Sequence, residues 1–247
     1  MRLALIYNVW DDHDWLMQSI NHHVNLAEGI IVVYSNTSNF GEISNQFNTG
    51  GVFYQLEPDL MLSPSENERR KRNYGLQLAK SQGYTHFLMI DADEFYDPVS
   101  FLAQKERIFK NDIAGTVCRT KVYFSKPTLT IGFDTTLVPF IHKLTPSLRF
   151  EWNTRYPYAF EGAKKDIRID PTRQLNINSG VEMINLVMHH YSWVRKDYAK
   201  KIRNSSARIN IERSTVLTDL SNAKAGYYCE FYGKHLEATS NPFNLCV

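Results

Sequence analysis

One stretch of the sequence decides the predicted fold: His86-Phe87-Leu88-Met89-Ile90-Asp91-Ala92-Asp93-Glu94-Phe95. Its four apolar residues follow Gly83-Tyr84-Thr85 and predict a short strand that is buried on both faces. The strand stops at three carboxylates within four positions. Ionised carboxylates at the end of a buried strand repel one another unless a cation neutralises them. We therefore expect this strand end to lie in a site that binds a cation.

A divalent metal ion is the cation that these residues suit best. Asp91 and Asp93 are two positions apart, so in an extended chain their side chains lie on the same side and can bind one ion. Mg²⁺ and Mn²⁺ accept such oxygen ligands, usually one or two carboxylates together with water and substrate phosphates. The alternative is a strand end whose acids are solvated or paired with Lys and Arg. The apolar run before the acids and Glu94-Phe95 after them favour the metal.

Length and composition limit the possible classes of protein. The chain has 247 residues, 43% of them apolar, which is enough for one large α/β domain. Its formal net charge of +2 does not by itself indicate a nucleic-acid or membrane partner. No segment approaches the roughly 18 apolar residues of a membrane span, and the N-terminal apolar run is too short for a signal peptide. We therefore expect a soluble, cytoplasmic protein without a transmembrane segment.

Further apolar runs predict strands that alternate with helices, as in a mostly parallel sheet. Residues 3–7 and 30–34 are near-continuous apolar runs of the kind found in strands buried on both faces. Polar residues follow each of them, at Asn8-Val9-Trp10 and at Ser35-Asn36. Ligands bind at this edge of an open α/β sheet. A helix is predicted between the two strands, over residues 16–27.

A basic helix is predicted over residues 65–81. Its start has the Ser65-x-x-Glu68 spacing of a capping box, and Gly83 ends it. The basic and amide side chains of its early turns are those of Arg69, Arg70, Lys71, Arg72 and Asn73. This face is either solvated or brings one or two of these side chains to an anionic ligand at the strand ends.

The second half of the chain is less regular. Residues 126–171 are rich in Pro, Gly and aromatic residues, which predicts loops and short strands that face a substrate. An apolar strand over 183–188 leads into His189-His190. A basic helix over about 194–209 follows, and its face is either solvated or meets phosphates.

One of the two adjacent histidines is predicted to complete the metal site. An imidazole together with carboxylate oxygens suits a Mn²⁺-type site. Side chains of neighbouring residues on a strand point in opposite directions, so only one of His189 and His190 can be the ligand. We choose His190.

These segments resemble the GT-A-fold glycosyltransferases. The run Leu88-Met89-Ile90-Asp91-Ala92-Asp93-Glu94-Phe95 is similar to the DxD segment of their family 2-like group. The strand ends at Asn8 and Asn36, the basic helix and His190-Tyr191-Ser192 with Arg195 extend the resemblance. It implies an α/β fold of GT-A type, a Rossmann-like, mostly parallel sheet flanked by helices, with an irregular acceptor-side insertion and a C-terminal helix. It also implies one domain over 1–247, with a nucleotide-sugar-binding half (1–115) and an acceptor-side half (116–247).

The resemblance implies a role for each matching position. Asp93 would bind the metal directly, Asp91 would bind the metal or the donor ribose, and His190 would complete the site. The other donor-binding positions are Asn8, Trp10, Asn36, Arg72 and Asn73. The implied donor is a nucleotide-diphosphate sugar, usually a UDP-sugar, held with Mn²⁺ or Mg²⁺. The family often has an aspartate after the second strand, where this chain has Ser35-Asn36, so the base stays open.

Transfer of a sugar from a diphosphate also needs help for the leaving group and for the acceptor. The leaving group gains negative charge, which the metal and Arg195 or Arg72 would stabilise. An inverting route needs a carboxylate that takes the acceptor proton. Asp134 and Glu161 are the candidates. We favour Glu161 because it follows an aromatic run that could stack on a sugar or a base: Trp152, Tyr156, Tyr158 and Phe160.

Several alternatives remain open. The acceptor could be a saccharide, a lipid-linked acceptor or DNA, because the basic segment 195–213 and the aromatic residues permit a phage-type enzyme that glycosylates modified bases. A metal-dependent hydrolase of nucleotides or phosphodiesters could use Asp91, Asp93 and His190 without any acceptor. A non-catalytic, lectin-like module would leave the acidic cluster without a role.

Overall fold

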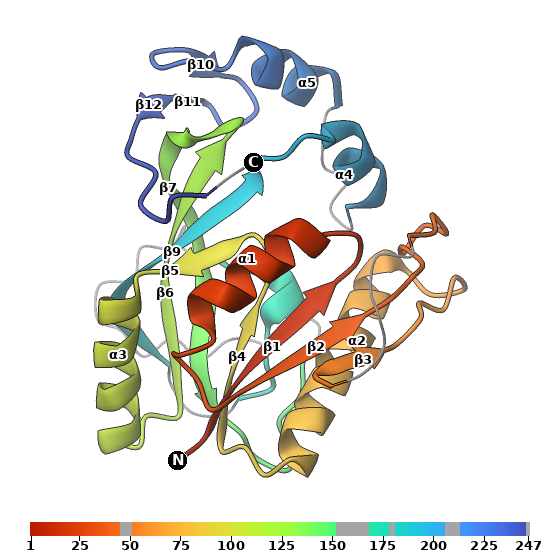
Figure 1. The fold of residues 1–247 in the computed structure, drawn as a ribbon, viewed down its shortest axis with the longest axis vertical. Coiled ribbons are helices and arrows are strands. Elements are labelled where there is room, and N and C mark those ends of the chain that lie inside the picture. The colour runs from red at the N-terminus through yellow and green to blue at the C-terminus, as the bar shows by residue number, and fades with distance from the viewer. Residues whose placement is uncertain (45–50, 152–167, 178–180, 206–212, 246–247) are drawn as a thin grey trace.

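The computed structural model describes residues 1–44, 51–151, 168–177, 181–205 and 213–245. A mixed sheet with the strand order β3-β2-β1-β4-β7-β6-β9-β5 runs through both halves of the chain, as Figure 1 shows. Its main strands are β1 (Leu3–Val9), β2 (Gly29–Tyr34), β3 (Phe53–Gln55), β4 (His86–Ile90), β5 (Glu94–Tyr96), β6 (Gly115–Phe124), β7 (Lys126–Lys143) and β9 (Glu182–Trp193). The predicted α/β class, with a mostly parallel sheet flanked by helices, is confirmed.

The first half of the chain forms the parallel part of the sheet. β1 lies between β2 and β4, and β3 is added outside β2, all in parallel. Val9 pairs with Tyr34, and Tyr7 pairs with Ile90, so the carboxyl ends of β1, β2 and β4 meet at one edge. These strands are almost entirely buried, as their apolar runs predict. This edge therefore carries the polar residues that follow each strand.

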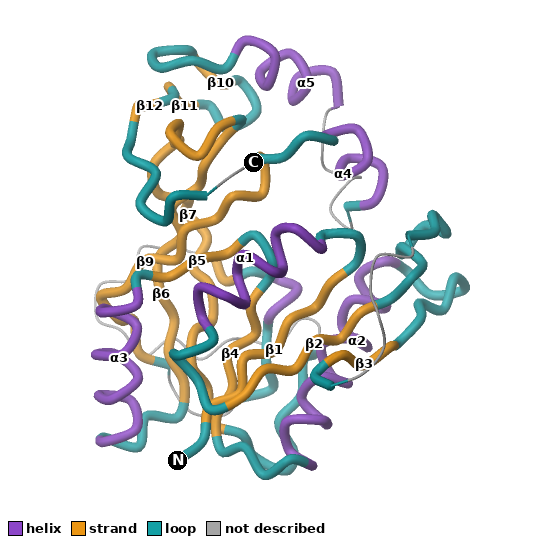
Figure 2. Tube along the Cα trace, in the orientation of Figure 1, coloured by secondary structure: helices purple, strands orange, loops and turns teal. Residues whose placement is uncertain are grey.

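The second half extends the same sheet with longer strands. β7 pairs antiparallel with β4 and β6, while β9 pairs parallel with β6 and antiparallel with β5. Short strands β8 (Arg168–Ile169) and β12 (Glu237–Ala238) pair with β7, and β10 (Tyr228–Cys229) pairs with β11 (Lys234–His235). Figure 2 shows how these strands continue from the parallel part. The tertiary pairings of β7 explain why the prediction of loops and short strands over 126–171 is wrong for 126–143.

Helices cover both faces of the parallel part. They are α1 (His13–His23), α2 (Pro64–Ser81) and α3 (Pro98–Lys110), and the 3₁₀ helix η1 (Pro171–Arg173) follows β8. The core under α1 and α3 contains Leu5 and Tyr7, whereas the core under α2 contains Ile6 and Val33. A third core lies beneath α4 (Tyr198–Asn204) and α5 (Arg213–Asn222) at the far end of the sheet.

All three predicted helices differ from the structure at their boundaries. The helix predicted over 16–27 is α1, which spans His13–His23 and has its C-terminal cap at Val24. α2 begins at Pro64, and its capping box pairs Ser63 with Glu66 instead of Ser65 with Glu68. Pro64 favours this register because proline fits the first helical position. The helix expected over about 194–209 is shorter, because the Asp197 side chain caps the start of α4 by accepting from the Lys200 N–H, and the C-terminal cap is Ser205.

The close approach of α2 to the sheet depends on Gly75. A Cβ atom there would lie 2.5 Å from Ile6 Cγ2 and 3.4 Å from Val33 Cγ2. We expect Gly75→Val to lower the free energy of unfolding by about 1–3 kcal/mol, because overpacking displaces the helix. Urea unfolding measures this, with Gln77→Val on the exposed side of the same helix as the control. Equal unfolding midpoints for the two variants would contradict the packing.

Candidate functional site

A cavity of about 610 Å³ lies at the carboxyl ends of β1, β2 and β4. Its size falls within the roughly 300–1,000 Å³ of small-molecule sites, and its position is the ligand-binding edge of an open α/β sheet. The wall is strongly charged: the acidic side chains are Asp11, Asp12, Asp14, Glu68, Asp91, Asp93, Asp170 and Asp197, and the basic ones are Lys71, Arg195, Lys196, Lys200 and Lys201. The segment that decides the fold thus ends in this cavity.

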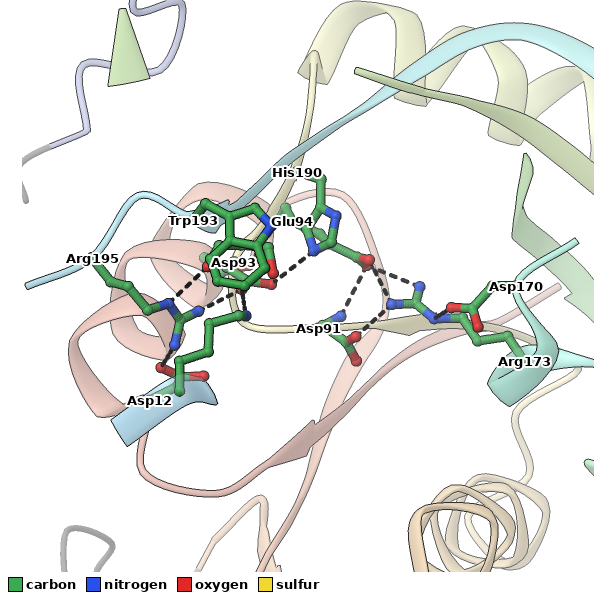
Figure 3. A network of polar contacts seen from close by, with 12 residues as sticks. Asp12, Asp91, Asp93, Glu94, Asp170, Arg173, His190, Trp193 and Arg195 are labelled. Carbon is green, nitrogen blue, oxygen red and sulfur yellow. Dashed lines mark hydrogen bonds and ion pairs between the residues drawn. The ribbon is translucent and has the colours of Figure 1, made fainter. Parts of the chain in front are cut away.

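Residues 91–93 form a turn and are not extended. The Glu94 backbone N–H donates to the Asp91 carbonyl at 3.1 Å, and the Asp91 N–H donates to Glu94 Oε2 at 3.0 Å. The prediction of an extended chain that aligns Asp91 with Asp93 is therefore wrong, although both residues line the cavity. Figure 3 shows the two carboxylates facing different partners.

Asp91 and Glu94 are neutralised by Arg173, which η1 carries into the protein interior. Arg173 Nη2 lies 2.6 Å from Asp91 Oδ2 and 2.5 Å from Glu94 Oε1, and Nη1 lies 3.0 Å from Glu94 Oε2. Arg72 Nη2 adds a longer contact of 3.5 Å to Asp91 Oδ1, while its shorter bond of 2.6 Å is with Glu68. Both arginine side chains are almost fully buried. Arginine thus supplies much of the positive charge that we had predicted from a metal ion.

Asp93 lines the cavity, and its partners differ from those of Asp91 and Glu94. Its Oδ2 accepts from Arg195 Nη2 at 2.6 Å and lies 3.7 Å from Lys201 Nζ. Its Oδ1 lies 3.6 Å from His190 Nε2 (Figure 3). Burial alone would raise the pKa of Asp93, but Lys201, His190 and Arg195 hold it well below its ordinary value. Asp93 is therefore an anion that presents one oxygen towards His190.

The two adjacent histidines occupy different environments. His190 pairs with Glu94 across β9 and β5, which places its ring beside Asp93. Burial opposes protonation of His190, but the hydrogen bond and the charge of Asp93 raise its pKa. His189 Nδ1 lies 2.8 Å from the Tyr123 hydroxyl, and its ring packs against Phe243. The structure therefore brings His190, and not His189, to the acids.

Arg195 links Asp93 to the end of β1. Its Nη1 donates to Asp12 Oδ1 at 2.8 Å, and its Nε donates to the Ser192 carbonyl at 2.9 Å. Burial raises the pKa of Asp12 to about 6, against the opposing charge of Arg195. One guanidinium therefore spans two cavity carboxylates from strand ends that are far apart in sequence.

α4 forms another wall of the cavity. Lys200 pairs with Asp11, and the ring of Trp10 lies under Lys200 Nζ at 5.3 Å. Asn204 Nδ2 donates to Glu42 Oε2 at 2.7 Å. These contacts fasten the C-terminal half of the chain to the loops that follow β1 and β2.

The residues fit a metal ion that is shared with a ligand. Among the described residues, no three His, Cys, Asp or Glu side chains lie close enough together to hold an ion by themselves. The predicted set of Asp91, Asp93 and His190 is thus not assembled, because Asp91 is held by arginines. Asp93 Oδ1 and His190 Nε2 can still share one ion whose other ligands are phosphate oxygens and water.

The other predicted site residues are only partly brought together. Asn8 and Trp10 line the cavity, and Asn8 Oδ1 is buried without a hydrogen-bond partner among the described residues. The Asn36 carbonyl accepts from Trp10 Nε1 at 3.4 Å, so Asn36 lies beside the cavity wall. Asn73 does not reach the cavity, because its side chain is occupied by the backbone of Phe150. Its Oδ1 accepts from the Phe150 N–H at 2.7 Å, and its Nδ2 donates to the Phe150 carbonyl at 3.1 Å.

Neither predicted carboxylate base is placed in the described cavity wall. Asp134 lies on β7, where its Oδ1 accepts from the Thr136 N–H at 2.9 Å, and it is not among the described residues that line the cavity. Glu161 lies outside the described residues, as does the aromatic run that precedes it.

Several site residues were not singled out from the sequence. Lys71 and Lys201 belong to basic segments that we noted, but a run of positive charge does not show which member turns inward. Asp12 follows β1 among other polar residues. Arg173 follows Asp170-Pro171-Thr172 and has no motif around it, so only the fold reveals its partners.

Comparison with known proteins identifies no family. No protein-family model matches the chain, and no curated protein matches it. Over 49% of its length the chain is similar to residues 1–349 of TarS from S. aureus, at 12% identity, with a TM-score of 0.31 and 36% of that chain covered; this TarS fragment is also known in complex with UDP. Mannose-1-phosphate geranyltransferase from Thermus thermophilus is similar at 11% identity over 52% of this chain and 44% of that one, with a TM-score of 0.29.

Among the described residues, no helix combines the length and the apolar composition that crossing a membrane requires.

Lys71 gives the site a testable pH dependence. Its Nζ donates to the Val9 carbonyl and to Ser35 Oγ, and burial lowers its pKa from 10.5 to about 7. Between these pH values the unfolded chain binds more protons than the folded protein. The free energy of unfolding should therefore rise with pH in this window, by up to about 1.4 kcal/mol per pH unit.

Urea unfolding between about pH 7.5 and 9.5 checks this sign. Lys71→Met should reduce the rise and leave the part that comes from Lys201, whose pKa burial lowers to about 8. Lys110→Met, at the exposed end of α3, should keep the whole rise. The same slope in the wild-type protein and in Lys71→Met would show that Lys71 stays protonated in the folded state.

Proposed function

We propose that the protein is a GT-A-type glycosyltransferase that binds a nucleotide-diphosphate sugar in this cavity and transfers the sugar to an acceptor hydroxyl. One observation carries the proposal. Asp93 Oδ1 and His190 Nε2 lie 3.6 Å apart in a cavity of about 610 Å³ at the carboxyl ends of parallel strands. A diphosphate fits such a place because it is anionic and can share a metal ion with two protein ligands.

The donor would be held by the basic wall of the cavity. Arg195, Lys200 and Lys201 line it, and cationic side chains form strong hydrogen bonds with phosphate oxygens. Trp10 offers an aromatic face, and Asn8 offers a carbonyl oxygen that has no hydrogen-bond partner among the described residues. These two residues would meet the base or the ribose, and a UDP-sugar stays the preferred donor.

The metal ion would be Mn²⁺ or Mg²⁺, held by Asp93 and His190. When bound, it would supply Lewis-acid stabilisation to the negative charge that develops on the leaving diphosphate. Asp91 pairs with Arg173 and would therefore not bind the metal. Because a third of its side chain is exposed (34%), it would accept a hydrogen bond from the nucleotide sugar. Arg195, which already contacts Asp93, would stay close enough to donate to the leaving group.

The proposal gives the acidic turn a role that the alternatives lack. A lectin-like module needs no charged cavity of this kind. A hydrolase would use the same donor site but would release sugar or phosphate without an acceptor, so product analysis separates the two reactions. A DNA acceptor predicts turnover that falls steeply with salt, because phosphate contacts release counterions; a saccharide acceptor predicts little dependence on salt.

Ligand-induced stabilisation tests the proposal. With Mn²⁺ present, UDP at about 100 times its dissociation constant should raise stability by roughly 2.7 kcal/mol, or Tm by about 5–10 °C. Omitting Mn²⁺ should remove most of this shift, because Asp93 and His190 then have no ion to share with the diphosphate. Differential scanning fluorimetry measures the shift with each nucleoside diphosphate in turn.

Asp93→Asn should lose the metal-dependent part of the shift. Asp112→Asn is the matched control, since Asp112 forms an exposed ion pair with Lys143 and its positive φ of 50° suits asparagine. If no nucleoside diphosphate stabilises the wild-type protein with either Mn²⁺ or Mg²⁺, the proposed function is wrong.

A further inference from the structure

We propose that Arg173 is a positioning residue, which sets the 91–94 turn so that Asp93 and His190 together meet the metal and the diphosphate. The inference rests on the proposed function and extends it to a residue that touches neither the ligand nor the metal. Arg173 is 2% exposed and lies behind the acids, on the side of η1 (Figure 3).

One guanidinium ties together the three segments that shape the turn. Nη1 donates to the Met89 carbonyl at 3.3 Å, near the end of β4. Nη2 bonds the Asp91 carboxylate at the start of the turn, and both Nη atoms bond Glu94 at the start of β5. Because Met89 and Glu94 are buried, water cannot replace their bonds when the guanidinium is removed.

The 91–94 turn fixes the distance between Asp93 and His190. Glu94 pairs with His190 across β5 and β9, and the Tyr191 N–H donates to the Asp93 carbonyl at 2.8 Å. A shift of Glu94 therefore moves Asp93 along β9, away from the 3.6 Å approach to His190. Arg173 therefore acts on the two proposed metal ligands, Asp93 and His190, through this backbone.

No other described cation can take over this task. Arg173 is the only described Lys or Arg within 4.0 Å of the Glu94 carboxylate, which is almost fully buried. Arg72 reaches only Asp91, and it is shared with Glu68. Asp170 holds Arg173 from behind, with its Oδ2 3.3 Å from Nε. Without Arg173, Asp91 and Glu94 would repel each other and open the turn.

Two variants separate positioning from charge balance. Arg173→Met should lower Tm, because it leaves two carboxylates without their main partner. The double variant Glu94→Gln/Arg173→Met removes the most buried charge as well and should recover most of that loss. Both variants should still bind UDP with Mn²⁺ at least about tenfold more weakly than the wild-type protein, because Asp93 and His190 are no longer held in place.

Isothermal titration calorimetry gives the affinity, and the electron paramagnetic resonance spectrum of bound Mn²⁺ reports its ligand geometry. The spectrum should differ from the wild-type spectrum in both variants. Arg107→Met is the matched control, since Arg107 forms an exposed ion pair with Glu182, and it should keep the wild-type affinity and spectrum. Arg173→Lys should not rescue binding, because an ammonium group cannot bridge the three segments as a planar guanidinium does.

The outcomes are distinct. Wild-type affinity and an unchanged Mn²⁺ spectrum in the double variant would show that Arg173 only balances charge, and would overturn the inference. Rescue by Arg173→Lys would overturn the bridging geometry in the same way. If the wild-type protein binds no nucleoside diphosphate with either Mn²⁺ or Mg²⁺, the proposed function fails, and the inference falls with it.

Discussion

The structure depends on how three carboxylates are neutralised within one buried turn. Taking a charge out of water costs several kcal/mol unless a partner of opposite charge meets it with good hydrogen bonds. Arg173 provides this for Asp91 and Glu94, whereas Arg195, Lys201 and His190 do so for Asp93. The acidic turn is therefore held together by the protein itself and does not need a metal ion for its shape.

This division of partners gives the acids different tasks. Asp91 and Glu94 are held by a buried guanidinium, so they fix the backbone of the turn. Asp93 lies at the cavity wall, with one oxygen towards Arg195 and the other towards His190. The arrangement unites distant parts of the chain, because the acids follow β4, His190 lies on β9 and Arg173 follows β8. A ligand in the cavity thus contacts a surface that exists only when both halves of the sheet are formed.

The sequence predicts the regular part of this structure well. Apolar runs located β1, β2 and β4, because these signals are local. The 18-residue β7 was missed because its pairing with β4 and β6 overrides a composition typical of loops. For the site, the acidic run and His190 were found together, but Asp91 was expected to bind a metal and instead pairs with Arg173. Arg173 is 79 positions after Glu94, and no local pattern reports a contact of that range.

A crystal structure of the protein with a nucleoside diphosphate and Mn²⁺ tests the central claim most directly, because Mn²⁺ is located by its anomalous scattering. The account predicts one ion bound by Asp93 and His190 together with phosphate oxygens, with Arg173 still bonded to Asp91 and Glu94. An ion bound by Asp91, with Arg173 displaced from the turn, would contradict it.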